Sequence, residues 1–250
     1  MALELLARSR YEVTEIPVQT SEEPTKEGNR ESRRYPLFIN PREYSRLRKG
    51  GFLVSHFKKW FEQRALNRCL RGLENVHTVC DCPCGPGRLF PYWRSRSYVV
   101  IGVDLSDPMV EEATAQHRRL GLFGSVYKGD AFHPEKSLLQ VPDLVASVRF
   151  CYYFDRPGRC ALLRSLAAAS RRYVLVQYKT AQTLRGQKTF SRTQGKKISC
   201  QPKQFCTYEE MRREIEEAGL KCMRIELISQ ASDRVFILAE KQKPSGLMIS

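Results

Sequence analysis

A short run of cysteine, glycine, proline and one acidic residue stands where a strand is expected to turn into a helix. It reads VCDCPCGPGR over residues 79–88 and contains Asp81, Gly85 and Gly87. Glycines in such a turn let the backbone approach a ligand closely, and the following helix offers free N–H groups. Asp104 follows seventeen residues after Gly87, and a carboxylate at that place can accept both hydroxyls of a ribose. The pattern predicts a site for an adenosine-containing cofactor.

Two features of this turn separate a dinucleotide from a sulfonium cofactor. NAD-binding turns carry a third glycine three residues after the second, where this chain has Phe90. Asp81 lies just before the turn and is unfavourable beside a pyrophosphate, because both groups are negative. The same carboxylate suits a cationic methionine group. We therefore expect a sulfonium cofactor.

Alternating strands and helices are expected to position this turn. Apolar, β-rich runs predict strands at residues 76–82, 98–104, 125–130, 143–150, 171–179, 221–229 and 233–241, and helices are expected at 107–120, 158–170 and 207–219. The last two strands are separated by a short turn, so they form an antiparallel pair. The pattern predicts an α/β fold with a doubly wound, mostly parallel seven-stranded sheet, one antiparallel edge strand and helices on both faces.

The run VCDCPCGPGR, then VIGVDLSDPMVEEA and GDAF, resembles the class I (Rossmann-like) S-adenosylmethionine-dependent methyltransferases. The resemblance covers residues 76–180 by motif and extends to residue 240 by strand order. It implies a Rossmann-like methyltransferase fold, S-adenosylmethionine as the cofactor and methylation as the reaction. It is specific for the class of cofactor and leaves the substrate open.

The resemblance also implies which residues meet the cofactor. They are Asp81, Cys84, Gly85, Gly87, Asp104, Leu105, Met109, Asp130, Ala131 and Arg149. Asp104 would hold the ribose, Asp130 would meet the adenine amino group, and the residues from Arg149 to Tyr152 would lie beside the methionine and the substrate. Tyr44 would close over the cofactor. The alternatives are a plain turn role for Asp130 and a core position for Tyr152.

The sequence does not single out a catalytic group. Candidate general bases are His133, Tyr152 and Asp155, with no reason to choose among them. Amino-methylating enzymes of nucleic acids carry Asn/Asp-Pro-Pro-Tyr/Phe after the fourth strand, where this chain has Arg-Phe-Cys-Tyr at 149–152. A Pro-Cys for covalent attack on a pyrimidine is also absent there, so both chemistries are disfavoured.

Positive charge is concentrated in residues 30–72, with twelve Lys or Arg and three acidic residues, and in residues 156–208. The formal net charge is +15, and residues 156–208 contain twelve Lys or Arg and no acidic residue. Such a surface attracts phosphates and other anions, although a merely solvated face would also explain it. Basic residues also fill the segment 180–206, which is long for a strand-to-helix link. They are Arg185, Lys188, Arg192, Lys196, Lys197 and Lys203.

The charge and the turn together leave three functional hypotheses. The leading one is methylation of an O or N atom of an anionic small or medium-sized acceptor, such as a metabolite, lipid or sugar. RNA is the nearest alternative acceptor, although no separate RNA-binding module is visible. The other class of hypothesis is a non-catalytic, cofactor-binding scaffold that uses its basic face for binding.

Composition changes along the chain predict its organisation. Residues 1–35 are polar and predict a disordered or loosely attached segment, and 36–73 predict an N-terminal helical lid with apolar residues at helical spacing. Residues 74–243 form the expected methyltransferase domain, which includes the basic insertion loop 180–206. Residues 244–250 are a tail.

Cysteine content and hydropathy indicate the cellular compartment in which the chain is expected. The nine cysteines are odd in number and lack the paired CxxC spacing of a zinc site, so we expect buried, reduced thiols and no metal. No apolar run approaches the roughly 18–20 residues of a membrane span, and the N-terminus does not resemble a signal peptide. A cytoplasmic location is expected. The oligomeric state is left open.

Overall fold

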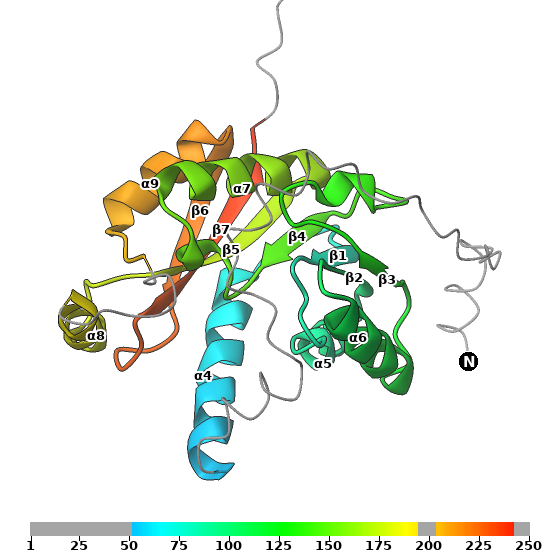
Figure 1. The fold of residues 1–250 in the computed structure, drawn as a ribbon, viewed down its shortest axis with the longest axis horizontal. Coiled ribbons are helices and arrows are strands. Elements are labelled where there is room, and N and C mark those ends of the chain that lie inside the picture. Colours follow the sequence, from blue (N-terminus) through cyan, green and yellow to red (C-terminus); the bar gives the residue numbers. More distant parts are fainter. Residues whose placement is uncertain (1–51, 195–203, 243–250) are drawn as a thin grey trace, which may run out of the picture. The chain divides into compact units, whose positions relative to one another are not determined.

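The computed structural model describes residues 52–194 and 204–242, and its central element is a seven-stranded sheet (Figure 1). Its strands are β1 (Thr78–Asp81), β2 (Val99–Asp104), β3 (Val126–Lys128), β4 (Leu144–Ser147), β5 (Tyr173–Lys179), β6 (Leu220–Leu227) and β7 (Arg234–Lys241). Their order is β3-β2-β1-β4-β5-β7-β6. The first five strands pair in parallel, and β7 runs antiparallel to both β5 and β6. The predicted fold class is confirmed.

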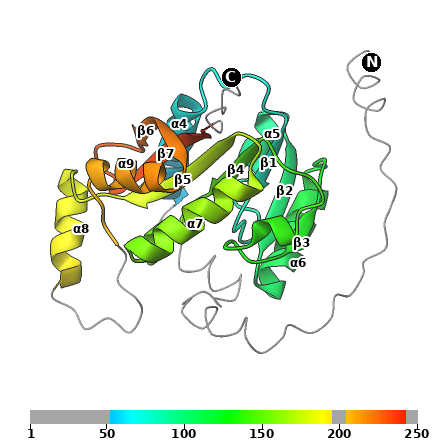
Figure 2. The same cartoon turned by 90° about the horizontal axis from the view of Figure 1, so that it is seen from above.

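Helices cover both faces of this sheet. They are α4 (Phe52–Cys69), α5 (Phe90–Ser95), α6 (Asp107–Arg119), α7 (Arg156–Ala169), α8 (Leu184–Gln194) and α9 (Tyr208–Glu217), with 3-10 turns η1 (Pro134–Lys136) and η2 (Cys151–Tyr153). Helices α7 and α9 lie on one face, and α4, α5 and α6 lie on the other (Figures 1 and 2). Sequential strands joined through helices in this way bring the carboxyl ends of β1, β2 and β4 to one edge of the sheet.

Burial explains why the central strands are continuously apolar. Every residue of β4 and of β5 is buried, because helices cover the sheet on both sides. Three polar residues, Ser147, Gln177 and Lys179, are nevertheless buried in these strands. Gln177 is completely buried in β5, and neither its amide nitrogen nor its amide oxygen has a hydrogen-bond partner.

The predicted capping threonine begins α9. The Thr207 hydroxyl accepts from the backbone N–H of Glu210, and the Glu210 carboxylate accepts from the backbone N–H of Thr207. This reciprocal pair satisfies two of the N–H groups that a helix start leaves free. Helix α7 begins similarly, since the Asp155 carboxylate accepts from the backbone N–H of Gly158.

A buried ion pair joins the two helices on that face. The guanidinium of Arg159 in α7 donates to both carboxylate oxygens of Glu214 in α9, at 2.9 and 2.5 Å. The hydroxyl of Tyr178 in β5 donates to the same carboxylate at 2.8 Å. The two charged side chains are 7% and 0% exposed, so this contact is a polar centre inside the core.

Helix α4 has one buried face and one exposed face. Its buried residues Ala65, Leu66 and Cys69 recur at helical spacing and, with Leu70 directly after the helix, belong to the main core cluster. Beyond the sheet-facing stripe, Phe57, Trp60 and Phe61 are 61%, 49% and 39% exposed. The guanidinium of Arg68 binds the carboxylate of Glu226 in β6 at 2.7 Å, which fixes the carboxyl end of the helix.

The segment after β5 differs from the expectation of a loop. Residues Leu184–Gln194 form α8, so this part of the predicted 180–206 loop is helical, and residues 195–203 lie outside the described part. The Thr183 hydroxyl accepts from the backbone N–H of Gly186 at the start of this helix. Arg185 and Lys188 are exposed on it.

The cysteines agree with the expectation of reduced thiols. Those in the described residues are unpaired, and all are buried apart from the half-buried Cys222. Among these residues, none of the helices has the length and apolar character needed to cross a membrane. The predicted segments 1–35 and 244–250 and the residue Tyr44 lie outside the described residues.

Candidate functional site

The glycine turn after β1 places its two glycines in different surroundings. Gly85 and Gly87 have φ of +55° and +73°, in the left-handed region that favours glycine. A Cβ atom on Gly87 would lie 2.6 Å from the ring of Phe90, so packing against α5 requires this glycine. A Cβ on Gly85 would meet no atom within 4 Å. Gly85 therefore faces open space, as the approach of a ligand to the turn requires.

Asp104 lies at the end of β2, directly across from Gly85. Its carboxylate accepts from the backbone N–H of Gly85 at 2.8 Å and from that of Ser106 at 3.0 Å. The residue is 8% exposed, and burial raises the pKa of its carboxyl group. The two hydrogen bonds fix the carboxylate beside the open side of the turn. This arrangement fits the adenosine ribose of the expected cofactor.

Asp81 ends β1 and lies beneath the same turn. Its carboxylate accepts from the indole N–H of Trp93 at 3.3 Å, and the residue is 2% exposed. Burial raises the pKa of Asp81 to about 7, against a lowering effect of Arg88 and of the Trp93 hydrogen bond. A raised carboxyl pKa means that the folded chain binds more protons than the unfolded chain. The free energy of unfolding therefore falls as pH rises from about 4 to 7.

The same pKa predicts a pH dependence of cofactor binding. A cationic cofactor favours ionised Asp81, so the affinity for S-adenosylmethionine is expected to rise about 10-fold between pH 6 and pH 8. Calorimetric titrations across this range measure the slope, and the variant Asp81→Asn should abolish it. A flat profile of the wild type, or an equal slope in Asp81→Asn, would show that Asp81 does not meet the cofactor's cation.

The remaining predicted residues divide between the cofactor edge and the core. The Cys84 sulfur lies 3.2 Å from a Cβ built on Gly102, so this side chain faces the sheet, and only the Cys84 backbone remains near the turn. Met109 and Ala131 are buried and Leu105 is half-buried, all close to the ends of β2 and β3. The Asp130 carboxylate accepts from the backbone N–H of Phe132 at 2.9 Å, which is the turn role anticipated as its alternative.

An aromatic cluster adjoins Asp130. The ring of Phe132 lies 5.2 Å from that of Phe154, and the ring of Phe150 lies 4.8 Å from that of Phe154, both in edge-to-face geometry. Phe150 and Phe154 flank η2, which follows β4. The cluster therefore links the segment after β3 to the segment after β4 with an apolar wall.

Two arginines and one glutamate meet at the same edge of the sheet, and Arg149 is the predicted site residue among them. The Glu62 carboxylate of α4 accepts from Arg88 at 2.6 Å and from Arg149 at 3.1 Å. Glu62 and Arg88 were not among the predicted site residues. Glu62 interrupts the apolar stripe that continues through Ala65, Leu66 and Cys69, and an acidic residue within such a stripe is a signal that could have identified it.

A second charged pair lies at the carboxyl end of β5. Lys179 is buried and pairs with the carboxylate of Asp233. Its ammonium lies 4.8 Å from the ring centre of Phe205 and 5.8 Å from that of Tyr152. The Asp233 carboxylate and the two ring faces therefore stabilise this buried cation within the protein.

The three candidate general bases occupy different environments. His133 is exposed and its Nδ1 lies 3.6 Å from a carboxylate oxygen of Glu135. Asp155 is exposed and caps α7. Tyr152 is buried in η2, near Lys179. Of the three, Tyr152 is therefore the one placed between the ends of β4 and β5.

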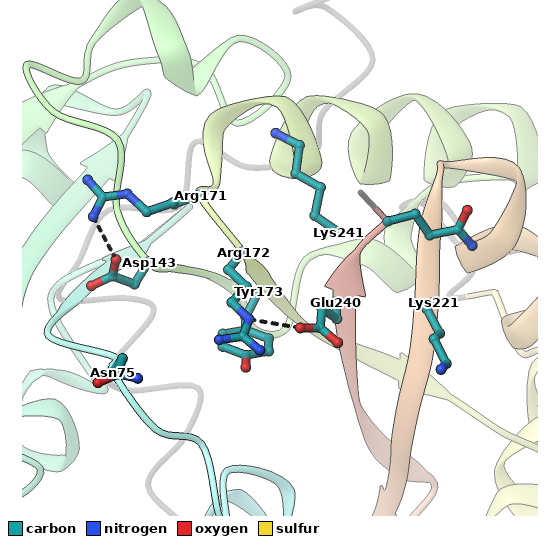
Figure 3. Close-up of a pocket in the computed structure, with 9 residues that line it drawn as sticks. Asn75, Asp143, Arg171, Arg172, Tyr173, Lys221, Glu240 and Lys241 are labelled. Carbon is teal, nitrogen blue, oxygen red and sulfur yellow. Dashed lines mark hydrogen bonds and ion pairs between the residues drawn. The ribbon is translucent and has the colours of Figure 1, made fainter. Parts of the chain in front are cut away.

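A separate groove of about 930 Å³ lies at the opposite edge of the sheet, where β4 and β5 begin (Figure 3). Its two arginines are engaged by neighbouring acids: Arg171 contacts Asp143 at 3.3 Å, and Arg172 contacts Glu240 at 2.8 Å. Asp143 also accepts from the backbone at the start of β1. These contacts tie the strand starts together, and we assign the groove a structural role.

Comparisons with known proteins agree with this geometry. Residues 79–172 match the family model of a methyltransferase domain. A curated relative, malonyl-[acyl-carrier protein] O-methyltransferase of Salmonella typhimurium, is 33% identical over 101 residues. That alignment covers 37% of this chain and 40% of the relative, so the chain matches less than half of the relative's length.

Solved structures share the fold at low sequence identity. Magnesium protoporphyrin IX methyltransferase from Synechocystis, with bound S-adenosylhomocysteine, has a TM-score of 0.61 at 17% identity, covering 81% of this chain and 96% of its own. Mitomycin 7-O-methyltransferase has a TM-score of 0.62 at 17% identity, covering 81% of this chain and 58% of its own.

Residues 79–172 thus resemble a methyltransferase domain, and the described part of the chain has the fold of solved S-adenosylmethionine-dependent methyltransferases. This family match and this shared fold agree with the class of enzyme and the cofactor that the motifs predict.

Proposed function

We propose that this chain transfers a methyl group from S-adenosylmethionine to an O or N atom of an anionic small or medium-sized acceptor. The observation that carries the proposal is the buried Asp104 carboxylate, which is held beside Gly85 where the turn faces open space. A carboxylate and an open glycine turn at the carboxyl edge of a parallel sheet are the groups that an adenosine moiety needs.

The cofactor contacts are part of this proposal. Asp104 would accept from the ribose hydroxyls, and Asp81 beneath the turn would face the cationic end. Half-buried Leu105 and the buried side chains of Met109 and Ala131 supply apolar surface near the adenine, as does the aromatic cluster beside Asp130. Tyr44 keeps its predicted role as a closing residue.

Methyl transfer requires the protein mainly to position the acceptor atom against the methyl group. S-adenosylmethionine supplies a methyl group on a sulfonium centre that is already a good leaving group. The residues around the site must hold the acceptor atom in line, at about 3–3.5 Å, and exclude water. Among the described residues, the aromatic residues after β4 and helix α4 would serve these roles. Helix α4 lies within residues 36–73, for which a lid is predicted.

Charge supports an anionic acceptor. The formal net charge is +15, and residues 156–208 contain twelve Lys or Arg and no acidic residue. Arg185 and Lys188 of this stretch are exposed on α8, which follows β5. The named relatives act on acceptors as different as malonyl-[acyl-carrier protein] and mitomycin, so the class of acceptor rests on this chain's own charges. Metabolites, lipids and sugars with acidic groups all satisfy it.

RNA remains the alternative acceptor, supported by the exposed Arg185 and Lys188 of α8. A non-catalytic scaffold is the remaining alternative. A cytoplasmic location, which rests on the sequence, also remains a prediction.

Calorimetric titration of the purified chain with S-adenosylmethionine, S-adenosylhomocysteine and NAD tests the proposal. We expect micromolar binding of the first two and no binding of NAD. Methyl transfer from labelled cofactor to a panel of carboxylated and phosphorylated acceptors then identifies the substrate class. Binding without transfer to any acceptor would favour the scaffold. Transfer to RNA, with an affinity that falls steeply with salt, would favour the alternative acceptor.

A further inference from the structure

One buried carboxylate connects three parts of the candidate site. The Glu62 side chain in α4 is 6% exposed, and its Oε2 accepts from Arg88 Nη1 at 2.6 Å. Both of its oxygens also accept from Arg149 Nη2, at 3.1 and 3.2 Å. Arg88 directly follows Gly87 of the glycine turn, and Arg149 follows β4. Glu62 thereby joins the helix over the sheet to the cofactor turn and to the segment after β4.

The backbone of Arg149 gives this contact a second, independent sign of function. Its φ is +67°, in the left-handed region that residues other than glycine rarely adopt. Such conformations persist only where the surroundings hold them, and they cluster at ligand sites. The Glu62 carboxylate holds the Arg149 guanidinium, and the same carboxylate binds Arg88 beside the turn.

Charge completes the argument. Arg88 lowers the pKa of buried Asp81, so the Arg88 guanidinium interacts electrostatically with the carboxylate that directly precedes the turn. The methionine part of the cofactor carries one carboxylate in addition to its cationic groups. Two guanidinium groups beside the turn are the natural partners of that carboxylate, because planar guanidinium donors match carboxylate geometry.

We propose that Glu62 is a positioning residue that holds Arg88 and Arg149 in place for the cofactor's carboxylate. This inference rests on the proposed function. It makes the affinity for the cofactor depend on a residue of α4, and so couples the position of this helix to cofactor binding.

A purely structural role for Glu62 predicts a different outcome. Helix α4 has its own anchor in its last turn, the ion pair between Arg68 and Glu226 at 2.7 Å. The Arg224 guanidinium adds a hydrogen bond to the carbonyl of Cys69 at 3.1 Å. Removing the Glu226 charge therefore disturbs the packing of α4 without touching the turn, which makes Glu226→Gln a matched control.

The test compares S-adenosylhomocysteine binding by calorimetry in the wild type, Glu62→Gln, Glu62→Asp and Glu226→Gln, with thermal melting of each. We expect Glu62→Gln to raise the dissociation constant about 10-fold, in line with the loss of charged hydrogen bonds. Glu62→Asp should recover part of the affinity, and Glu226→Gln should bind as the wild type does. If Glu62→Gln does not fold, Arg149→Lys tests the same bridge from its other end, with the same expected loss.

Three results would overturn the proposal. Unchanged or tighter binding in Glu62→Gln would mean that the bridge is dispensable or competes with the cofactor. An equal loss in Glu226→Gln would assign the effect to helix packing. If the wild type does not bind S-adenosylhomocysteine, the proposed function itself is wrong. This outcome is distinguishable from a failure of the inference about Glu62, because it is measured on the wild type alone.

Discussion

Replacing Arg159 by methionine is expected to lower the free energy of unfolding by about 3–5 kcal/mol. The substitution leaves Glu214, whose side chain is completely buried, with the Tyr178 hydroxyl but without its charged partner. An uncompensated carboxylate in a core is costly, because water no longer solvates it. Urea unfolding of the variant and the wild type measures the difference.

The double variant Arg159→Met/Glu214→Leu supplies the control for this prediction. Removing both charges leaves an apolar core of similar volume, and such replacements are often neutral or stabilising. We expect the double variant to recover most of the stability that the single variant loses. A single variant as stable as the wild type would show that the ion pair contributes nothing to the fold.

Replacing Asp104 by alanine is expected to weaken binding of S-adenosylhomocysteine by about 1–3 kcal/mol, or roughly 5- to 150-fold. The variant removes the acceptor expected for the ribose, and it also frees the backbone N–H of Gly85 that shapes the turn. The first loss acts on the bound state, and the second also removes a contact of the free protein. Calorimetric titration gives the affinity, and circular dichroism checks that the fold is retained.

Asp107 provides the matched control for Asp104. It lies three residues further along, is exposed, and pairs with Lys128 at 2.9 Å on the surface. Surface pairs of this kind contribute little, so Asp107→Ala should bind the cofactor as the wild type does. Unchanged affinity in a folded Asp104→Ala variant would mean that the ribose is held elsewhere.

Local signals in the sequence were sufficient to predict the seven strands and the helices α6, α7 and α9. Thr207 with Glu210 three residues later marks the start of α9, because a capping pair depends only on neighbouring residues. The apolar residues of β5 mark a strand covered on both faces for the same reason, since burial on two sides leaves no polar alternation.

Contacts between distant residues could not be predicted in this way. Glu62 meets Arg149 across 87 positions of the chain, and nothing near either residue specifies the partner. The two glycines of the turn look equivalent in sequence, but the ring of Phe90 decides that Gly87 packs while Gly85 stays open. Helix α8 was missed because its residues are mostly polar, with no apolar stripe long enough to predict it.

The position of β7 inside the sheet has a consequence for how the chain reaches its native state. β7 pairs with β5 on one side and with β6 on the other, although β6 precedes it in the sequence. Until residues 234–241 are available, the seven residues of β5 keep an open, apolar edge, and β6 has no neighbour to join. Open edges of this kind recruit other chains. The period of greatest aggregation risk during synthesis therefore extends until this strand has been made and inserted.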